Sequence, residues 1–502
     1  MAAKEYFIGF DVGSSSVKAS LLEAESGAVV ASATSPDQEL PMQADAPGWA
    51  EQHPDLWWEH VVKCAHLLKK QLDFDASSVK AIGISYQMHG LVLVDQQGKV
   101  LRPSIIWCDS RAVNYGKKAF EDLGADFCLS HYLNSPGNFT ASKLKWVKEN
   151  EPQVYSKIHK MMLPGDYIAY KLTGEIKTTF SGLSEGIMWD FKQGKIASEL
   201  LEYYGTSPDF IPDLQPSFSI QGHTTTAAAK ELGLVENIPV TYRAGDQPNN
   251  ALSLNVLEPG EVAATAGTSG VVYGIIDKPA YDQQSRVNTF IHVNHEANRE
   301  RYGVLLCLNG TGIQNSWLRN LVSTKDKVDY DEMNQSAMTI PIGADQVLFY
   351  PFGNGAERIL ENKDLNARIV GLNFNRHQQA HLYRAAQEGI VYALNYGFQI
   401  MKAMGMPIKK IRAGNANMFL SPLFREAFAN VTGASVELYN TDGAQGAARG
   451  AGIGLGYYSR EEAFKGLKVI STVDPDPDLQ SNYQEIYGKW QQELNNMLKE
   501  IK

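Results

Sequence analysis

The chain has 502 residues, which is too long for one hydrophobic core and predicts two domains. Its net charge of −10 argues against nucleic acid or an anionic membrane as the main partner, and 44% hydrophobic and 20% charged residues are typical of globular proteins. The four cysteines lack metal-ligand spacing, and neither a signal peptide nor an apolar stretch of membrane-spanning length is evident, so we expect a cytoplasmic protein.

The first half of the chain predicts an α/β unit. Apolar runs predict strands at 6–10, 16–22 and 28–33, and helical spacing of apolar residues predicts a helix over 55–72, followed by a strand at 79–85. Three strands, a helix and a further strand are the opening order of a ribonuclease-H-like unit. Further helices are predicted at 111–123, 140–149 and 164–172.

The second half repeats this theme. The predicted elements are strands at 262–276 and 302–308, helices near 310–321, 378–404 and 421–432, and a helix in the Gly/Ala-rich segment 443–456 that packs closely against a neighbour. We therefore expect an α/β protein with two ribonuclease-H-like domains, 1–245 and 246–502, and a central cleft.

One phosphate-loop pattern occurs twice, about half a chain apart. DVGSSSVK covers 11–18 and TAGTSGVV covers 265–272, and each lies between two apolar runs, as in a strand, a tight turn and a second strand. A Gly/Ser/Thr turn exposes backbone N–H groups and can bind an anion. Two such hairpins could hold a nucleotide polyphosphate. Either segment alone would be interpreted as an ordinary hairpin turn.

Two acidic residues stand where a predicted strand ends in a glycine turn. Asp11 closes the first strand, and Asp246 follows the apolar run 238–242. Phosphoryl transfer needs a carboxylate near a divalent metal and another that accepts a proton from the attacking hydroxyl. The alternatives are that Asp246 caps the next helix and that Asp11 stabilises its turn.

The segment SYQMHG, at 85–90, ends another apolar strand. Met88 and His89 at such a strand end could line a polyol pocket, with the thioether packed on carbon and the imidazole bonded to a hydroxyl. The alternative is that the histidine has a structural role.

Taken together, the motifs resemble those of the FGGY carbohydrate kinases of the actin-like ATPase superfamily, and among these the xylulose kinases. The resemblance runs nearly end to end. It includes DVGSSSVK at 11–18, SYQMHG at 85–90, LRPSIIWCDSR at 101–111, SPGNFTASKL at 135–144, MLPGDYIAYKLTGE at 162–175, AGDQ at 244–247, TAGTSGV at 265–271, EGIVYAL at 388–394 and DGAQGAARGAG at 442–452.

The resemblance implies ATP-dependent phosphorylation of D-xylulose to D-xylulose 5-phosphate, with ATP and Mg²⁺ as cofactors. It assigns Asp246 as the general base and Asp11 as the carboxylate that holds Mg²⁺ through water, with Asp246 also beside the metal. It places sugar and the first phosphate loop on the N-terminal domain, and nucleotide and the second loop on the C-terminal domain. The implied sugar contacts are Met88, His89, Asp246 and Gln247. The implied ATP contacts are Gly13, Ser14, Ser15, Lys18, Gly267, Thr268, Ser269, Gly310, Gln314, Gly414 and Asn417.

Three other functions remain open on the sequence. The first is a kinase of the same family that acts on another ketose, polyol or sugar acid, such as ribulose, fuculose or gluconate. The second is an actin-like ATPase without a small-molecule acceptor, and the third is a binding or regulatory protein that has lost catalysis. The expected partners are a small-molecule sugar and ATP, with no nucleic acid and no membrane. The sequence does not fix the oligomeric state, for which a homodimer is one option.

Overall fold

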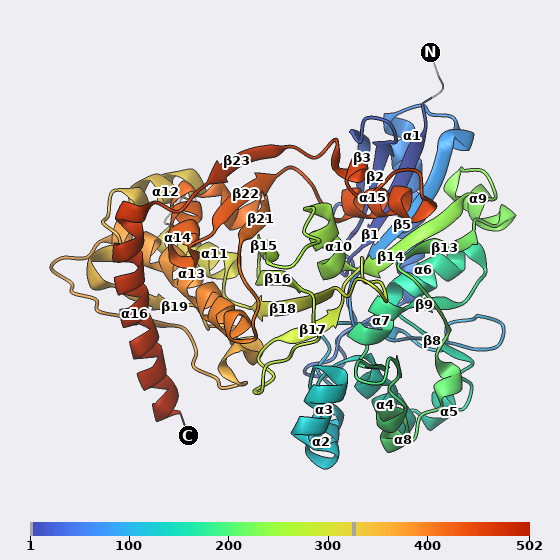
Figure 1. The fold of residues 1–502 in the computed structure, drawn as a ribbon, viewed down its shortest axis with the longest axis horizontal. Coiled ribbons are helices and arrows are strands. Elements are labelled where there is room, and N and C mark those ends of the chain that lie inside the picture. The colour runs from blue at the N-terminus through green and yellow to red at the C-terminus, as the bar shows by residue number, and fades with distance from the viewer. Residues whose placement is uncertain (1–3, 324–327, 502) are drawn as a thin grey trace. The chain divides into compact units, whose positions relative to one another are not determined.

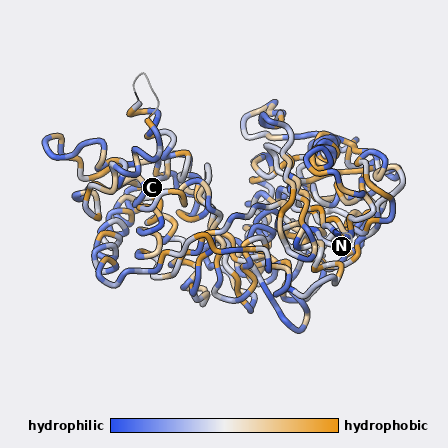
Figure 2. The backbone as a smooth tube through the Cα atoms, turned by 90° about the horizontal axis from the view of Figure 1, so that it is seen from above, coloured by the Kyte–Doolittle hydropathy of each residue, from blue (hydrophilic) through white to orange (hydrophobic). Residues whose placement is uncertain are grey.

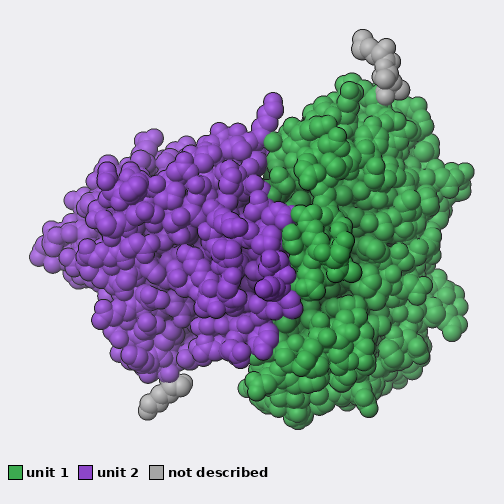
Figure 3. Space-filling model, in the orientation of Figure 1, with its two compact units in different colours: residues 1–257, 290–302, 441–467 green, residues 258–289, 303–440, 468–502 purple. Residues whose placement is uncertain are grey.

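The computed structural model describes residues 4–323 and 328–501, which form two compact units (Figure 3). Unit 1 takes in Met1–Leu257, Phe290–Tyr302 and Thr441–Leu467, and unit 2 takes in Glu258–Thr289, Gly303–Asn440 and Lys468–Lys502. Each unit is therefore built from segments that are distant in the sequence. The division into functional domains at 245/246 stays a prediction.

Unit 1 is built on a six-stranded sheet with the order β13-β14-β5-β1-β2-β3 (Figure 1). β1 pairs antiparallel with β2 and parallel with β5, which in turn pairs parallel with β14. The order β3-β2-β1-β5-β14 is that of a ribonuclease-H-like unit, as predicted. The strands are β1 (Tyr6–Val12), β2 (Val17–Glu23), β3 (Val29–Ser35), β5 (Val79–Tyr86), β13 (Phe218–His223) and β14 (Pro239–Gly245).

Helices and short strands surround this sheet. The helices of unit 1 are α1 (Pro54–Gln71), α2 (Val113–Leu123), α3 (Ala125–Tyr132), α4 (Thr140–Asn150), α5 (Pro152–Tyr155), α6 (Pro164–Thr173), α7 (Phe180–Glu185), α8 (Ser198–Tyr204), α9 (Thr226–Leu232), α10 (Asp246–Ser253) and α15 (Gly443–Leu455). Its short strands are β4 (Glu51–Gln52), β6 (Val92–Val94), β7 (Ser104–Ile105), β8 (Lys160–Met162), β9 (Lys177–Thr179), β10 (Trp189–Asp190), β11 (Lys195–Ile196) and β12 (Asp213–Gln215).

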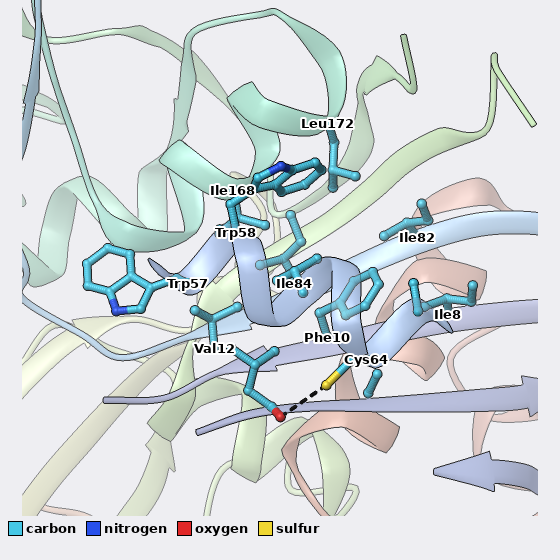
Figure 4. Close-up of a cluster of buried hydrophobic side chains, with 14 of the residues drawn as sticks. Ile8, Phe10, Val12, Trp57, Trp58, Cys64, Ile82, Ile84, Ile168 and Leu172 are labelled. Atoms are coloured by element: carbon cyan, nitrogen blue, oxygen red, sulfur yellow. Dashed lines mark hydrogen bonds between the residues drawn. The ribbon is translucent and has the colours of Figure 1, made fainter. Parts of the chain in front are cut away.

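The main core of unit 1 lies between the sheet and helices α1 and α6 (Figure 4). Alternate residues of β1, including Phe10, are fully buried against Trp57 and Trp58 of α1. Cys64 of α1 donates its thiol to the carbonyl of Val17, 3.3 Å away. Hydrophobic and hydrophilic stretches alternate along the backbone when it is coloured by hydropathy (Figure 2). Burying a phenylalanine side chain such as that of Phe10 contributes about 1.5–3 kcal/mol.

Helix α15 packs on the same sheet although it comes from the other half of the chain. A Cβ built on Gly9 of β1 would lie 2.0 Å from the carbonyl oxygen of Ala444, and one on Gly83 of β5 would lie 2.0 Å from that of Ala447. Glycine is therefore required at both strand positions. The predicted close packing of the Gly/Ala-rich helix is confirmed, and the helix brings its N-terminus to the end of β1.

Unit 2 contains a seven-stranded sheet with the order β17-β18-β16-β15-β21-β22-β23. Its inner order β18-β16-β15-β21-β22 repeats that of unit 1, so the duplicated α/β fold is confirmed. The strands are β15 (Glu261–Ala266), β16 (Gly270–Ile276), β17 (Asn288–Ile291), β18 (Tyr302–Leu308), β19 (Leu348–Tyr350), β20 (Arg368–Val370), β21 (Lys410–Gly414), β22 (Ser435–Tyr439) and β23 (Val469–Val473).

The helices of unit 2 cover this sheet and include two that the sequence did not predict, α12 and α16. They are α11 (Gly312–Val322), α12 (Tyr330–Met338), α13 (Gln379–Ala403), α14 (Pro422–Thr432) and α16 (Pro477–Glu500). Across both units, 3-10 helices occur at Ala76–Ser78, Pro208–Phe210, Ala344–Gln346, Glu357–Leu360, Asn417–Leu420 and Glu462–Phe464. No helix in 4–323 or 328–501 combines the length and apolar character needed to cross a membrane.

Candidate active site

Asp11 lies near the end of β1, opposite Ser85 of β5. The Ser85 hydroxyl donates a hydrogen bond of 2.7 Å to Asp11 Oδ1. The first residue of α15 is also close, because a Cβ built on Gly443 would lie 2.3 Å from Asp11 Oδ2. Burial raises the pKa of Asp11 above its ordinary value, while the Ser85 hydrogen bond and the Lys18 ammonium lower it in part. The carboxylate thus faces a helix N-terminus, which stabilises negative charge.

Asp246 is the first residue of α10 and directly follows β14. Because β1 and β14 both pair in parallel with β5, their carboxyl ends lie at the same edge of the sheet. Gln247 donates a hydrogen bond of 3.1 Å from Nε2 to Asp246 Oδ2. Burial, together with the negative charge of Asp11, raises the pKa of Asp246 from 3.8 to about 7. A carboxyl that titrates near neutral pH is suited to general base catalysis.

The first predicted phosphate loop is the turn of residues 13–16 between β1 and β2. The N–H of Gly13 closes the turn by donating to the carbonyl of its last residue, 3.0 Å away. Trp107 donates from Nε1 to Oγ of Ser14 at 3.2 Å. Ser15 and Lys18 are exposed. These residues share one hairpin with Asp11, as the sequence predicted.

Met88 and His89 directly follow the end of β5. Met88 is buried, and a Cβ built on Gly245 would lie 2.5 Å from Met88 Cγ, so this pair lies against the residue that precedes Asp246. The His89 ring packs edge-on against Phe139, with 4.8 Å between ring centroids, and its Nδ1 lies 2.9 Å from the carbonyl oxygen of Glu185. Unit 1 thus brings together the predicted sugar contacts and both predicted catalytic carboxylates.

The second predicted phosphate loop belongs to unit 2, where Gly267, Thr268 and Ser269 join β15 to β16. Thr311 donates from Oγ1 to the carbonyl of Gly267 at 2.8 Å, and the N–H of Gly312 donates to the same oxygen at 2.7 Å. A Cβ on Gly312 would lie 2.4 Å from this oxygen. The loop is therefore held tightly against the N-terminus of α11, which favours anion binding at this end of the helix.

The remaining predicted nucleotide contacts also lie in unit 2. Gly310 packs so closely on the main chain that a Cβ would lie 1.5 Å from a carbonyl oxygen. The Gln314 side chain is buried and donates to the carbonyl of Ala386 in α13 at 3.0 Å. Gly414 ends β21, and the exposed Asn417 lies beside the second loop, since its Nδ2 would be 3.5 Å from a Cβ on Gly267.

Sequence reasoning missed two buried ionisable residues beside His89. Glu185, the last residue of α7, directs Oε1 toward the backbone N–H of His89, and Lys143 of α4 donates to the carbonyl of His89 at 2.8 Å. Lys143 lies within the SPGNFTASKL segment, which was recognised as a motif although no role was assigned to this lysine. Glu185 has no motif around it that would have identified it.

Comparison with known proteins places this site in a family. The model of the FGGY carbohydrate kinases' N-terminal domain matches residues 6–253, and the model of their C-terminal domain matches residues 262–456. A xylulose kinase of Escherichia coli strain K12 is 30% identical over 448 residues, covering 89% of this chain and 88% of the relative.

Solved structures share the whole fold. The xylulose kinase from Rhodospirillum rubrum superposes with a TM-score of 0.88 at 23% identity, covering 98% of this chain and 99% of that one. The gluconate kinase from Lactobacillus acidophilus superposes with a TM-score of 0.89, also at 23% identity, with 99% of each chain covered. The molecule is thus a two-domain α/β protein of the actin-like ATPase fold. The chain belongs to the FGGY family of carbohydrate kinases.

Proposed function

We propose that this kinase transfers the γ-phosphoryl group of ATP to D-xylulose and forms D-xylulose 5-phosphate. The observation that carries the proposal is the pair of carboxylates at one edge of the unit 1 sheet, where the charge of Asp11 helps to raise the pKa of Asp246 to about 7. The Met88–His89 pair lies against the residue before Asp246, which supports a sugar site at this position. The names of the similar kinases favour D-xylulose as the sugar.

Asp246 is the general base in this proposal and takes the proton from the attacking sugar hydroxyl. The hydrogen bond from Gln247 orients the Asp246 carboxylate and leaves its other oxygen for the proton. Asp11 would hold Mg²⁺ through water, with Asp246 beside it, and carboxylate oxygens are the ligands that this ion prefers. Mg²⁺, when bound, neutralises phosphate charge. ATP would bind to the two phosphate loops and to the other predicted nucleotide contacts, which are Gly13, Ser14, Ser15, Lys18, Gly267, Thr268, Ser269, Gly310, Gln314, Gly414 and Asn417. The sugar would bind on 1–245 and the nucleotide on 246–502.

Charge at the site supports a neutral sugar over a sugar acid. Asp246 follows the residue that lies against Met88, and the carboxylate of Asp11 is close enough to Asp246 to raise its pKa. A sugar carboxylate here would add a further negative charge, and like charges repel strongly where water is excluded. The likeness to a gluconate kinase structure therefore shows a shared fold and does not favour gluconate as substrate.

A panel of sugars tests the proposal. ADP formation is measured with ATP, Mg²⁺ and, in turn, D-xylulose, ribulose, fuculose, glycerol and gluconate. D-Xylulose should give the highest kcat/KM. A higher kcat/KM with another acceptor would overturn the substrate assignment, and ADP formation unaffected by every acceptor would overturn the kinase proposal. Asp213→Asn changes an exposed acid of unit 1 and is a matched control for substitutions at Asp246.

The proposal also includes a cytoplasmic location, and a homodimer stays one option for the assembly. The four cysteines Cys64, Cys108, Cys128 and Cys307 are free thiols, which suits a reducing compartment. Sedimentation of the purified protein tests the assembly.

A further inference from the structure

The backbone of His89 has a left-handed conformation, with φ of 61°. Such a conformation costs a non-glycine residue on the order of 1 kcal/mol or more and persists only where the surroundings hold it. No strand holds His89, because β5 ends at Tyr86, three residues before it. Side chains and loop carbonyls must therefore hold His89 in place.

Glu185 holds His89 at two points. Its main-chain carbonyl oxygen lies 2.9 Å from His89 Nδ1, and its carboxyl Oε1 lies 3.4 Å from the His89 backbone N–H. A carbonyl oxygen only accepts, so Nδ1 must carry the hydrogen. This hydrogen bond fixes the tautomer of a neutral imidazole and the orientation of its ring.

Lys143 holds the other end of the same residue. Its ammonium donates to the carbonyl of His89 at 2.8 Å and to the carbonyl of Ile106 at 2.9 Å. Lys143 is fully buried and Glu185 is 1% exposed. Burial lowers the pKa of Lys143 to about 7 and raises the pKa of Glu185 well above its ordinary value. Burying two ionisable groups is unfavourable, so their place beside one strained residue calls for a functional reason.

The carboxyl of Glu185 also reaches the residue before the general base. A Cβ built on Gly245 would lie 2.5 Å from Glu185 Oε2 and 2.5 Å from Met88 Cγ. In the described residues, Oε2 is buried without a well-formed hydrogen bond, and the buried Tyr86 hydroxyl lies nearby. Glu185 thus packs between the proposed sugar contacts and the end of β14.

We propose that Glu185 and Lys143 are positioning residues of the sugar site, which hold His89 in its left-handed conformation with its Nδ1–H directed at the Glu185 carbonyl. The inference rests on the proposed sugar kinase activity and adds two residues to which the comparisons give no role. Neither side chain needs to touch the sugar, since both act through His89.

Steady-state kinetics test the proposal with the acceptor that the wild-type enzyme phosphorylates best. Lys143→Met and Glu185→Ala should each raise the sugar KM roughly tenfold, which is the size expected for a lost hydrogen bond. Each should change the ATP KM less than about twofold. Glu185→Gln should retain the wild-type sugar KM within about twofold, because its amide oxygen still accepts from the His89 N–H. Lys145→Met and Glu149→Ala, an exposed ion pair on the same helix as Lys143, are the matched controls.

A double-mutant cycle separates positioning from a general loss of packing. In a His89→Gly background, which removes the imidazole and tolerates the left-handed backbone, Lys143→Met should have little further effect on the sugar KM. An equal effect in both backgrounds, or equal changes in both KM values, would overturn the proposal. If Lys143→Met does not fold, the sugar KM values of Glu185→Ala and Glu185→Gln test the proposal. A raised sugar KM in Glu185→Ala alone supports it, and equal sugar KM values in the two variants overturn it.

Nitrogen NMR of histidine-labelled protein gives a readout that does not depend on turnover. The His89 signal, assigned by its loss in His89→Gly, should show a neutral ring protonated at Nδ1. A ring protonated at Nε2 alone would contradict the positioning role. Failure of the proposed function is distinct, since it would appear as wild-type enzyme without sugar-dependent ADP formation.

Discussion

The hydroxyl of Ser85 donates a hydrogen bond of 2.7 Å to Oδ1 of Asp11 across the parallel pairing of β5 and β1. This bond favours the charged form of Asp11 and lowers its pKa against the effect of burial. Ser85 thereby favours the charged form of the Asp11 carboxylate, which we propose holds Mg²⁺ through water, although Ser85 would not contact the ion itself.

Ser85→Ala should therefore weaken the response to Mg²⁺. The half-saturating Mg²⁺ concentration should rise roughly three- to tenfold, as expected for the loss of one hydrogen bond to a charged group. A Mg²⁺ titration of kcat measures this. Ser20→Ala, at a buried serine of the adjacent strand β2 whose hydroxyl faces Ser32, is the control. An unchanged Mg²⁺ dependence in Ser85→Ala would remove Asp11 from the metal site.

The pH profile should report the titration of Asp246. A general base works only when deprotonated, and the pKa of Asp246 is raised to about 7, so kcat/KM for the sugar should fall as pH drops below this value. Bound Mg²⁺ favours the carboxylate and should move the midpoint lower. The remaining activity of Asp246→Asn should be flat over the same range. A wild-type profile without this acidic limb would contradict the assignment.

The same raised pKa predicts that Asp246 destabilises the fold at neutral pH. The native state holds the Asp246 proton up to about pH 7 and the unfolded chain loses it near pH 3.8, so the free energy of unfolding should fall as pH rises between these values. Without Mg²⁺, Asp246→Asn should be more stable than wild type by on the order of 2 kcal/mol at about pH 8, and the gain should shrink near pH 4. Urea unfolding at both pH values measures this, and Asp213→Asn should show no such gain.

Gly312→Ala tests the second phosphate loop. The new Cβ would lie 2.4 Å from the carbonyl oxygen of Gly267 and would push the loop away from α11. The ATP KM should rise about tenfold or more while the sugar KM changes little. Gly488→Ala, in α16 with no atom within 4 Å of the new Cβ, should leave both KM values unchanged. Equal effects on both substrates in Gly312→Ala would place this loop outside the nucleotide site.

Much of the fold could be predicted because its signals are local. The strands around the two Gly/Ser/Thr turns are short apolar runs, and the structure forms the hairpins β1–β2 and β15–β16 at these places. Asp11 and Asp246 could be placed at strand ends from the sequence, and the parallel pairing on both sides of β5 explains why those ends meet.

What could not be predicted depends on contacts between distant segments. The Gly/Ala composition of α15 predicted close packing but did not identify its partner, which proved to be the unit 1 sheet at Gly9 and Gly83. Glu185 and Lys143 are single charged residues whose burial arises only when α7 and α4 fold around the end of β5. Their spacing in the chain carries no sign of their shared contact with His89.

Single-turnover transfer by Asp246→Asn tests the central claim most directly. The variant is mixed with labelled ATP, Mg²⁺ and D-xylulose at about pH 8, where the wild-type carboxylate is ionised, and labelled sugar phosphate is followed while calorimetry records sugar and nucleotide binding. The account predicts a loss of about 10²–10⁴ in the rate of transfer with both ligands still bound. Transfer at a near-parental rate would contradict it.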